Sequence, residues 1–192
     1  QSCHTSTKYP LPTVEELTSQ ISGSTIFTKL DLRQGYFQIP LHPDSQNLTT
    51  VVTHISVFRY TRVPFGLSSA PNCSQKMMST IFTGIPGVVF YLDDNVVHGP
   101  TCASHDERLH KVFKVLHHNH LTLNREKCVL AAYTIEFVGF CLIAAGLTLL
   151  QSNIKEPTMP AQVASFLGMT AYYLWFLPHY SATTAQLQQL LQ

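Results

Sequence analysis

The sequence predicts an α+β domain in which helices pack on an antiparallel core sheet. Strand-like and helix-like segments follow one another in a mixed order along the chain. Two of the apolar strand-like segments, at 88–92 and 95–98, are joined by a tight turn, as in a hairpin. With 192 residues, of which 45% are hydrophobic, the chain can bury the core of one domain or of two tightly coupled ones.

Three amphipathic helices are expected, at 13–22, from about residue 70 to the GIPG sequence at 84–87, and at 105–118. In the first, Thr13 and Glu16 have the spacing of a capping box. In the third, apolar residues recur at i, i+3, i+4 and i+7 from Leu109 to Leu116. Short helices are also expected near the C-terminal end, one ending before Pro178 and one at 182–191.

Segments rich in β-branched and aromatic residues predict the strands. They lie at 25–31, 36–41, 48–53, 57–63, 88–92, 95–98 and near 134–143. The most apolar stretch, 137–150, is shorter than the ~18–20 residues that a membrane-spanning helix needs. Glycines at 139 and 146 fit strands and a turn better, so we expect no membrane partner.

The charge of the chain is nearly balanced, because 12 Lys and Arg face 11 Asp and Glu, a net charge of +1. Charged residues make up 12% of the chain, against roughly 25% in an average soluble domain. This composition argues against a disordered polyelectrolyte, a histone-like protein and an acidic tail. Taken alone, it also argues against nucleic-acid binding, which usually requires a basic surplus.

The five cysteines form no CxxC pair, and the chain shows no charged-then-apolar leader. Both observations favour a reduced chain inside the cell. We therefore expect it in the cytoplasm, virus-like particles included, or in the nucleus, and not among secreted proteins.

Three of the five aspartates follow apolar strand-like segments, since Asp31 ends IFTKLD and Asp93-Asp94 follow VVFYL. Adjacent carboxylates in apolar surroundings repel each other and lose hydration, which costs several kcal/mol unless something compensates. A divalent cation such as Mg²⁺ is the usual compensation, and Asp31 could complete its site. The alternative is a solvated hairpin turn, because Asp favours turns.

Six motifs, in this order, closely resemble the reverse transcriptase of gypsy-class LTR retrotransposons. They are YPLP (9–12), LDLRQGYFQIPL (30–41), VPFGLSSAP (63–71), YLDD (91–94), LTLNREKC (121–128) and EFVGF (136–140). The segment at 165–181 resembles the one that follows the polymerase core in those elements. The resemblance implies a reverse transcriptase palm with partial fingers and the start of the thumb or connection. Its expected parts are a first palm segment (1–38), a fingers segment (39–67), the palm with both hairpins (68–148) and the thumb or connection helices (149–192).

The activity that the resemblance implies is RNA-directed DNA polymerisation by a retrotransposon Pol polyprotein. In that family the carboxylates matching Asp31 and Asp93 hold two Mg²⁺ ions, with Mn²⁺ as an alternative. Asp94 matches a second, supporting carboxylate, and the Leu32 carbonyl matches a further metal ligand. One ion activates the primer 3′-hydroxyl and the other neutralises the pyrophosphate leaving group. The implied partners are a primer on an RNA or DNA template and a dNTP.

Other residues match the family's nucleotide and primer contacts. Tyr36 resembles the aromatic gate against a ribose 2′-hydroxyl, and the alternative is a strand-core aromatic. Phe65 and Gly66 match the loop beside the incoming nucleotide and template. Lys127 matches a lysine near the leaving phosphates, and the alternative is a solvated side chain. The primer-grip hairpin is matched by Phe137, Val138, Gly139 and Phe140, for which an ordinary amphipathic strand is the alternative.

Several departures from the family pattern weaken the catalytic interpretation. The basic fingers segment before YPLP is missing, so an N-terminally truncated fragment is expected, and the stretch between Gly146 and Ser165 is short. Asn95 replaces an apolar residue, Ser74 a core phenylalanine and His120 a C-cap glycine. The competing hypothesis is therefore an inactive retroelement remnant or a co-opted RNA- or protein-binding domain.

Overall fold

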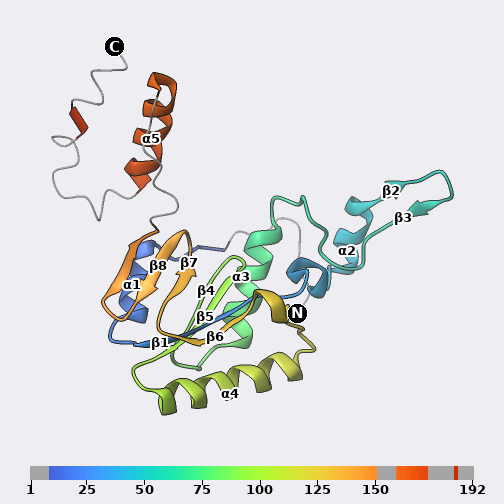
Figure 1. Cartoon of the computed structure of the whole chain (residues 1–192). Coiled ribbons are helices and arrows are strands. Elements are labelled where there is room, and N and C mark those ends of the chain that lie inside the picture. Colours follow the sequence, from blue (N-terminus) through green and yellow to red (C-terminus); the bar gives the residue numbers. More distant parts are fainter. Residues whose placement is uncertain (1–8, 151–158, 173–183, 186–192) are drawn as a thin grey trace.

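The computed structural model describes residues 9–150, 159–172 and 184–185. The helices are α1 (Val14–Ile21), η1 (Gly35–Gln38), α2 (Pro43–Gln46), η2 (Asn47–Thr49), α3 (Ala70–Ile81), α4 (Cys102–His118), η3 (Arg125–Lys127) and α5 (Pro160–Tyr172), where η marks 3₁₀ helices. The strands are β1 (Ile26–Leu30), β2 (Val51–Val52), β3 (Val57–Phe58), β4 (Val88–Tyr91), β5 (Asp94–Gly99), β6 (Val129–Ala132), β7 (Ile135–Phe137), β8 (Phe140–Ile143) and β9 (Gly146–Leu149). The predicted α+β fold with an antiparallel sheet is confirmed (Figure 1).

A four-stranded antiparallel sheet in the order β4-β5-β1-β6 forms the centre of the fold. In this sheet β1 pairs with β5 from Ile26↔Gly99 to Leu30↔Asn95. The β4–β5 hairpin ends with the pair Tyr91↔Asp94, so its turn consists of two residues. This register brings the C-terminal end of β1, followed by Asp31, to the same edge as the hairpin turn.

The central sheet separates two apolar cores, because side chains of a strand alternate between its faces. On one face Leu30 and Val97 pack with residues of α3 and α4, among them Met78 and Val112. On the other face β1 contributes Phe27, which is fully buried among side chains of α1 and of the β7–β9 sheet. Figure 1 shows the β7–β9 strands and α1 close together, away from α4.

The small antiparallel sheet β7-β8-β9 begins with a second two-residue turn. Phe137 pairs with Phe140, and both side chains are buried. The turn residues Val138 and Gly139 have φ angles of 53° and 78°, the conformation of the turns that fit the twist of a hairpin. The hairpin is therefore anchored by its phenylalanines and presents its turn at the sheet edge that carries Asp94.

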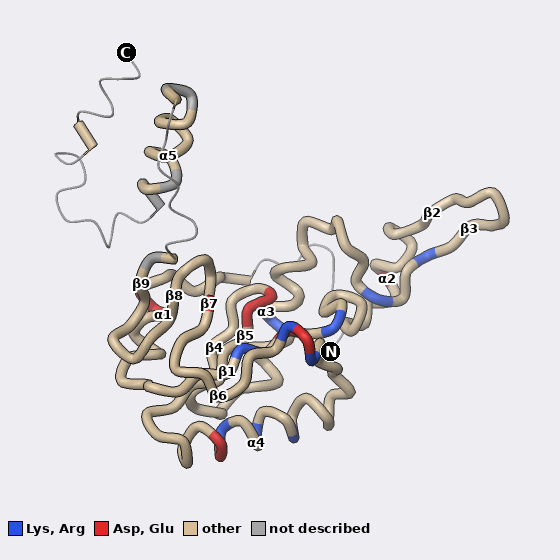
Figure 2. Tube along the Cα trace, viewed as in Figure 1, with Lys and Arg blue, Asp and Glu red and all other residues tan. Residues whose placement is uncertain are grey.

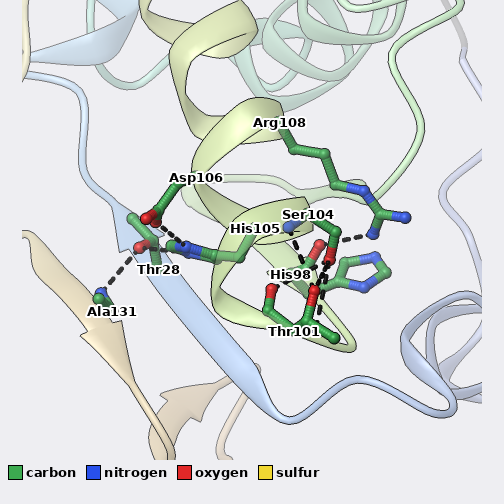
Figure 3. A network of polar contacts seen from close by, with 8 residues as sticks. All are labelled: Thr28, His98, Thr101, Ser104, His105, Asp106, Arg108 and Ala131. Atoms are coloured by element: carbon green, nitrogen blue, oxygen red, sulfur yellow. Dashed lines mark hydrogen bonds and ion pairs between the residues drawn. The ribbon is translucent and has the colours of Figure 1, made fainter.

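A buried polar network fixes the first turn of α4 to the sheet (Figure 3). Nε2 of the fully buried His105 lies 2.9 Å from the Thr28 hydroxyl, which also accepts a hydrogen bond from the amide of Ala131. Gly99 permits this close approach, since a Cβ there would lie 2.8 Å from the His105 backbone nitrogen. The helix and the sheet are thus joined by polar contacts as well as by apolar packing.

The predicted helices at 13–22, from 70 and at 105–118 are confirmed as α1, α3 and α4. The capping box of Thr13 and Glu16 is present, whereas α4 begins three residues earlier than predicted, at Cys102. The strands predicted at 25–31, 88–92, 95–98 and near 134–143 are also confirmed. Of the helix expected at 182–191 the structure describes only residues 184–185, which are helical, and most of the 149–192 segment lies outside the described residues.

The strand predicted at 36–41 is wrong, because the chain turns through Gln34 (φ 50°) into η1. The strands predicted at 48–53 and 57–63 shrink to the two-residue pair β2–β3. Here the hydroxyls of Thr49 and Thr50 bond to carbonyls three residues back, which favours η2 over an extended chain. Strand β6 was missed, since its side chains are mostly exposed and do not alternate.

In the described part of the chain, none of the helices combines the length and the apolar content needed to span a bilayer. The expectation of a fully reduced chain is wrong at Cys73, which is disulfide-bonded, whereas Cys102, Cys128 and Cys141 are free thiols. Spacing along the sequence does not show which thiols meet in the fold.

Candidate active site

The carboxylates of Asp31 and Asp93 line the same pocket, a cavity of about 390 Å³ at one edge of the central sheet. Four other predicted site residues line it as well: Leu32, Tyr36, Phe65 and Lys127. Strand β1 delivers Asp31 and the β4–β5 turn delivers Asp93, although 62 positions separate them in the sequence (93 − 31). A larger cavity of about 730 Å³ lies between η1, α3 and the end of α4, and neither of these aspartates lines it.

The electrostatics of the pocket centre on Asp93. Burial raises the pKa of this carboxyl, and the negative charges of Asp94 and Asp31 raise it further. A hydrogen bond from Tyr36 and the charge of Lys127 act in the opposite direction. The Lys127 ammonium lies 3.9 Å from Oδ2 of Asp31. Arg33 lines the pocket as well, so two cations and two carboxylates belong to its lining. Asp93 is nevertheless a partly buried carboxyl beside two others, a situation that an added cation would relieve.

Tyr36 lies in η1, so the alternative of a strand-core aromatic is wrong. Its hydroxyl donates a hydrogen bond to Asp93, and burial followed by the charge of Asp93 raises the pKa of this phenol. Its ring packs against Phe65 with a centroid distance of 5.2 Å. Gly66, next to Phe65, has a φ of 88°, a backbone conformation that favours glycine. Tyr36 and Phe65 thus form one wall of the pocket, whereas Gly66 does not line it.

Asp94 lies on a different side of the turn and does not line the pocket. Its Oδ1 is 2.7 Å from the Lys29 ammonium, and its Oδ2 accepts a hydrogen bond from the backbone amide of Val138 at 3.0 Å. The structure thus brings Asp31 and Asp93 together and turns the third aspartate toward the β7–β8 hairpin.

The sequence analysis missed Gln75, a buried residue of α3 that braces the β4–β5 turn. Its side-chain amide donates to the carbonyl of Phe90 at 3.0 Å and accepts from the amide of Leu92 at 3.1 Å. Leu92 has a φ of 56°, which costs a side-chain-bearing residue about 1–2 kcal/mol. A glutamine among the core-facing positions of an amphipathic helix, next to Met78, is the signal that could have revealed this role.

Asn124 and Ser74 were not assigned to the site either, although both line the pocket. The Asn124 amide donates to the Asp31 carbonyl at 2.8 Å and so holds the backbone next to the carboxylate. Ser74, noted in the sequence only as a departure, is buried on α3 at the wall of the pocket. Neither residue has a distinctive spacing to Asp31 in the sequence.

Two other residues that depart from the family pattern, Asn95 and His120, lie in a strand and at a helix end, as the sequence indicated. Asn95 is buried on β5, where its Nδ2 donates to the carbonyls of Leu30 and Asp93 at 3.2 Å each. Its Oδ1 is buried without a hydrogen-bond partner. His120 adopts the left-handed conformation of a C-cap glycine, with a φ of 56°.

The residues present fit a hard divalent cation through oxygen donors. Across the described ranges, no three His, Cys, Asp or Glu side chains form a ready-made metal cluster. Asp31, Asp93 and Leu32 nevertheless line one pocket, and two carboxylates with a backbone carbonyl are the donor types that Mg²⁺ takes when substrate phosphates complete its shell. The burial of Asp93 raises the pKa of this carboxyl, the charges of Asp94 and Asp31 raise it further, and this costly charged group is the observation that favours such an ion.

Comparison with known proteins places these features in a family. The family model described as reverse transcriptase (RNA-dependent DNA polymerase) matches residues 1–142. The transposon Tf2-3 polyprotein of Schizosaccharomyces pombe is 33% identical over 192 residues, covering 96% of this chain and 14% of the relative. The uncharacterized protein K02A2.6 of Caenorhabditis elegans is 33% identical over 165 residues, covering 83% of this chain and 13% of the relative. The chain therefore spans only about a seventh of these relatives.

Solved structures share the fold. The foamy viral protease-reverse transcriptase dRH in complex with double-stranded DNA superposes with a TM-score of 0.81 at 24% identity. This match covers 95% of the present chain and 33% of the viral one. The foamy viral protease-reverse transcriptase in complex with an RNA/DNA hybrid gives a TM-score of 0.79 at 24% identity, covering 95% and 26% of the two chains.

Proposed function

Since this chain belongs to the reverse transcriptase family, we propose that it performs RNA-directed DNA synthesis as the polymerase core of a longer, gypsy-class retrotransposon polyprotein. The single observation that carries the proposal is the pocket shared by Asp31 and Asp93. Two strands that are distant in the sequence deliver these carboxylates to one place, and an aromatic wall and a lysine stand beside them.

The carboxylates of Asp31 and Asp93, with the carbonyl of Leu32, would hold two Mg²⁺ ions. When bound, such ions supply Lewis-acid activation of the primer hydroxyl and charge neutralisation at the leaving pyrophosphate. Mn²⁺ takes the same oxygen donors and is the expected substitute. Because the pKa of Asp93 is raised, protons compete with a metal ion for this carboxyl more strongly than they would at an ordinary aspartate.

The remaining pocket residues orient the substrates. The Tyr36 ring, held by its hydrogen bond to Asp93 and by Phe65, would press on the sugar of the incoming dNTP and exclude a 2′-hydroxyl. The Lys127 ammonium would bind the phosphates, since its side chain is largely exposed at the pocket edge. Phe65 and Gly66 would pack on the nucleotide and template, where a backbone without a side chain permits close approach.

The primer on its RNA or DNA template would run past the Val138–Gly139 turn, which corresponds to the proposed primer grip. The viral relatives solved with double-stranded DNA and with an RNA/DNA hybrid support such a duplex partner. In this proposal residues 39–67 act as fingers and 68–148 as palm. The reaction takes place where dNTPs and RNA occur together, in the cytoplasm, its virus-like particles or the nucleus.

The proposal is tested by primer extension on an RNA template with Mg²⁺ and dNTPs. The wild-type chain is expected to extend, and Asp93→Asn to lose at least about a hundredfold of the rate, because the change removes a charge next to the reacting phosphate. Asp44→Asn is the matched control, since Asp44 is an exposed aspartate on α2. Undiminished extension by Asp93→Asn would overturn the metal-ligand assignment. A wild-type chain that binds RNA without extending a primer would favour the inactive, co-opted alternative.

A further inference from the structure

Lys29 is a β1 residue that none of the motifs assigns to a role, yet it contacts two other elements. Its ammonium lies 2.7 Å from Oδ1 of Asp94 on β5 and donates to the Glu136 carbonyl of β7 at 3.0 Å. The side chains of Lys29 and Asp94 are only 21% and 28% exposed. The pair is therefore partly shielded from water, in contrast to an ordinary surface ion pair.

The same ion pair reaches the turn of the β7–β8 hairpin. Oδ2 of Asp94 accepts a hydrogen bond from the Val138 amide at 3.0 Å, while Oδ1 faces Lys29. The Asp94 carboxylate thus joins Lys29 of β1 to the turn. Lys29 itself donates to the carbonyl of Glu136, two residues before Val138. Hydrogen bonds to charged groups are shorter and stronger than those between neutral groups, so these contacts define the position of the turn closely.

The hairpin as a whole does not depend on this contact for its attachment to the sheet. Phe137 and Phe140 are both fully buried in the core beneath it. A partly exposed ion pair contributes little to folding stability. What the Lys29–Asp94 pair adds is a fixed distance between the turn and the end of β1, where Asp31 follows two residues after Lys29.

We infer that Lys29 is a positioning residue that, through Asp94, clamps the Val138–Gly139 turn at a set place relative to Asp31 and Asp93. This inference rests on the proposed function, in which that turn guides the primer end. A misplacement of about 1 Å between reacting groups can lower a rate a hundredfold. The two polar partners of the Lys29 side chain, Asp94 and Glu136, do not line the nucleotide pocket, so we expect its effect on the primer side of the reaction.

The kinetic test uses Lys29→Met, which keeps the aliphatic stem and removes the ammonium. We expect kcat for primer extension to fall tenfold or more while KM for the dNTP stays within twofold of wild type. Lys29→Arg, which keeps the charge, should recover most of the loss. Lys111→Met is the matched control, because it removes the ammonium of the Lys111–Glu107 pair on the exposed side of α4. A purely structural role would lower the melting temperature and leave the kcat of the folded protein unchanged.

A second readout does not require activity. Hydrogen exchange of the Val138 amide, measured on the full chain by NMR, should speed up at least fivefold in Lys29→Met and stay unchanged in Lys111→Met. Unchanged exchange at Val138, or an unchanged kcat in an active protein, would overturn the clamp. A wild-type chain that fails to extend any primer would overturn the proposed function instead, while the exchange result still decides whether Lys29 holds the turn.

Discussion

His98 shows how a single buried residue makes the stability of this fold depend on pH. It is only 4% exposed on β5, and its Nδ1 lies 2.8 Å from the Ser24 hydroxyl. Burial lowers the pKa of His98 from 6.5 to about 4, and the charges of Arg108 and His105 act in the same direction. The backbone carbonyl of His98 also accepts a hydrogen bond from Arg108, so this cation cannot easily move away.

The sign of the pH dependence follows from the lowered pKa. The unfolded chain takes up a proton at His98 near pH 6.5, whereas the folded chain resists protonation until about pH 4. Above pH 6.5 the free energy of unfolding therefore does not depend on the titration of His98. Between pH 6.5 and 4 it falls, and His98 accounts for up to about 3 kcal/mol of this loss.

Urea unfolding at pH 7, 5.5 and 4 measures this loss. In His98→Asn the fall between pH 6.5 and 4 should be smaller by about that amount. His110→Asn, a change of an exposed histidine on α4, controls for the loss of an imidazole as such. An equal pH slope in wild type and His98→Asn would contradict the assignment.

At the scale of elements, helix α3 and the β4–β5 hairpin act as one unit through Gln75. The left-handed Leu92 is unfavourable by itself, and the two hydrogen bonds from Gln75 hold the backbone on either side of Tyr91. Because the turn carries Asp93, the helix determines where the carboxylate lies.

Gln75→Met preserves length and flexibility while removing both hydrogen bonds. We expect the free energy of unfolding to fall by about 1–3 kcal/mol, since the Leu92 amide and the Phe90 carbonyl lose partners. Primer extension should fall roughly tenfold at a temperature where the variant remains folded. Gln20→Met, an exposed glutamine of α1, is the matched control for both measurements. If Gln75→Met were as stable and active as wild type, the turn would be held by its own strands.

Helices and strands that are favoured by residues close together in the sequence were predictable from it. The capping box and the apolar period located α1 and α4, and the apolar strands on either side of Asp93 located the hairpin. The segment at 36–41 was not predictable, because β-propensity describes packing on a sheet surface, and here Tyr36 packs against Phe65 instead. Tertiary contact outweighed local preference in this segment.

Some residues of the candidate site were likewise predictable from the sequence, and others were not. Asp31 and Asp93 could be named from motifs, since the chemistry demands carboxylates next to strands. Lys29 and Gln75 could not, because their roles exist only in contacts to residues 65 and 17 positions away. A sequence read along its length shows residue types, and such contacts arise only once β1, β5 and α3 are assembled.

At the scale of the whole molecule, the net charge of +1 is distributed unevenly. Figure 2 shows acidic residues at the turn between β4 and β5, and basic residues on the segment that carries α2 and β3. In the proposed function, the carboxylates of Asp31 and Asp93 put negative charge where the phosphates of a nucleic acid would lie, beside the cations of Arg33 and Lys127. Divalent cations are expected to be needed for tight binding as well as for the reaction.

This expectation can be measured as the affinity for a primer–template duplex in EDTA. Replacing both pocket carboxylates, in Asp31→Asn with Asp93→Asn, should tighten metal-free binding roughly fivefold, equivalent to about 1 kcal/mol of removed repulsion. The double variant Glu15→Gln with Glu107→Gln changes the net charge equally on exposed parts of α1 and α4 and should have no such effect. Equal tightening by both pairs would mean that only the total charge matters.

The two-residue turn between β4 and β5 also determines which mutations this hairpin can tolerate. Substitutions at Leu92 change strain or contacts and leave the register of the strands intact. One inserted residue would reverse the facing of every following side chain or force a bulge, and would move Asp94 away from Lys29. An insertion in this turn is therefore expected to damage the site more than most substitutions of the residues nearby.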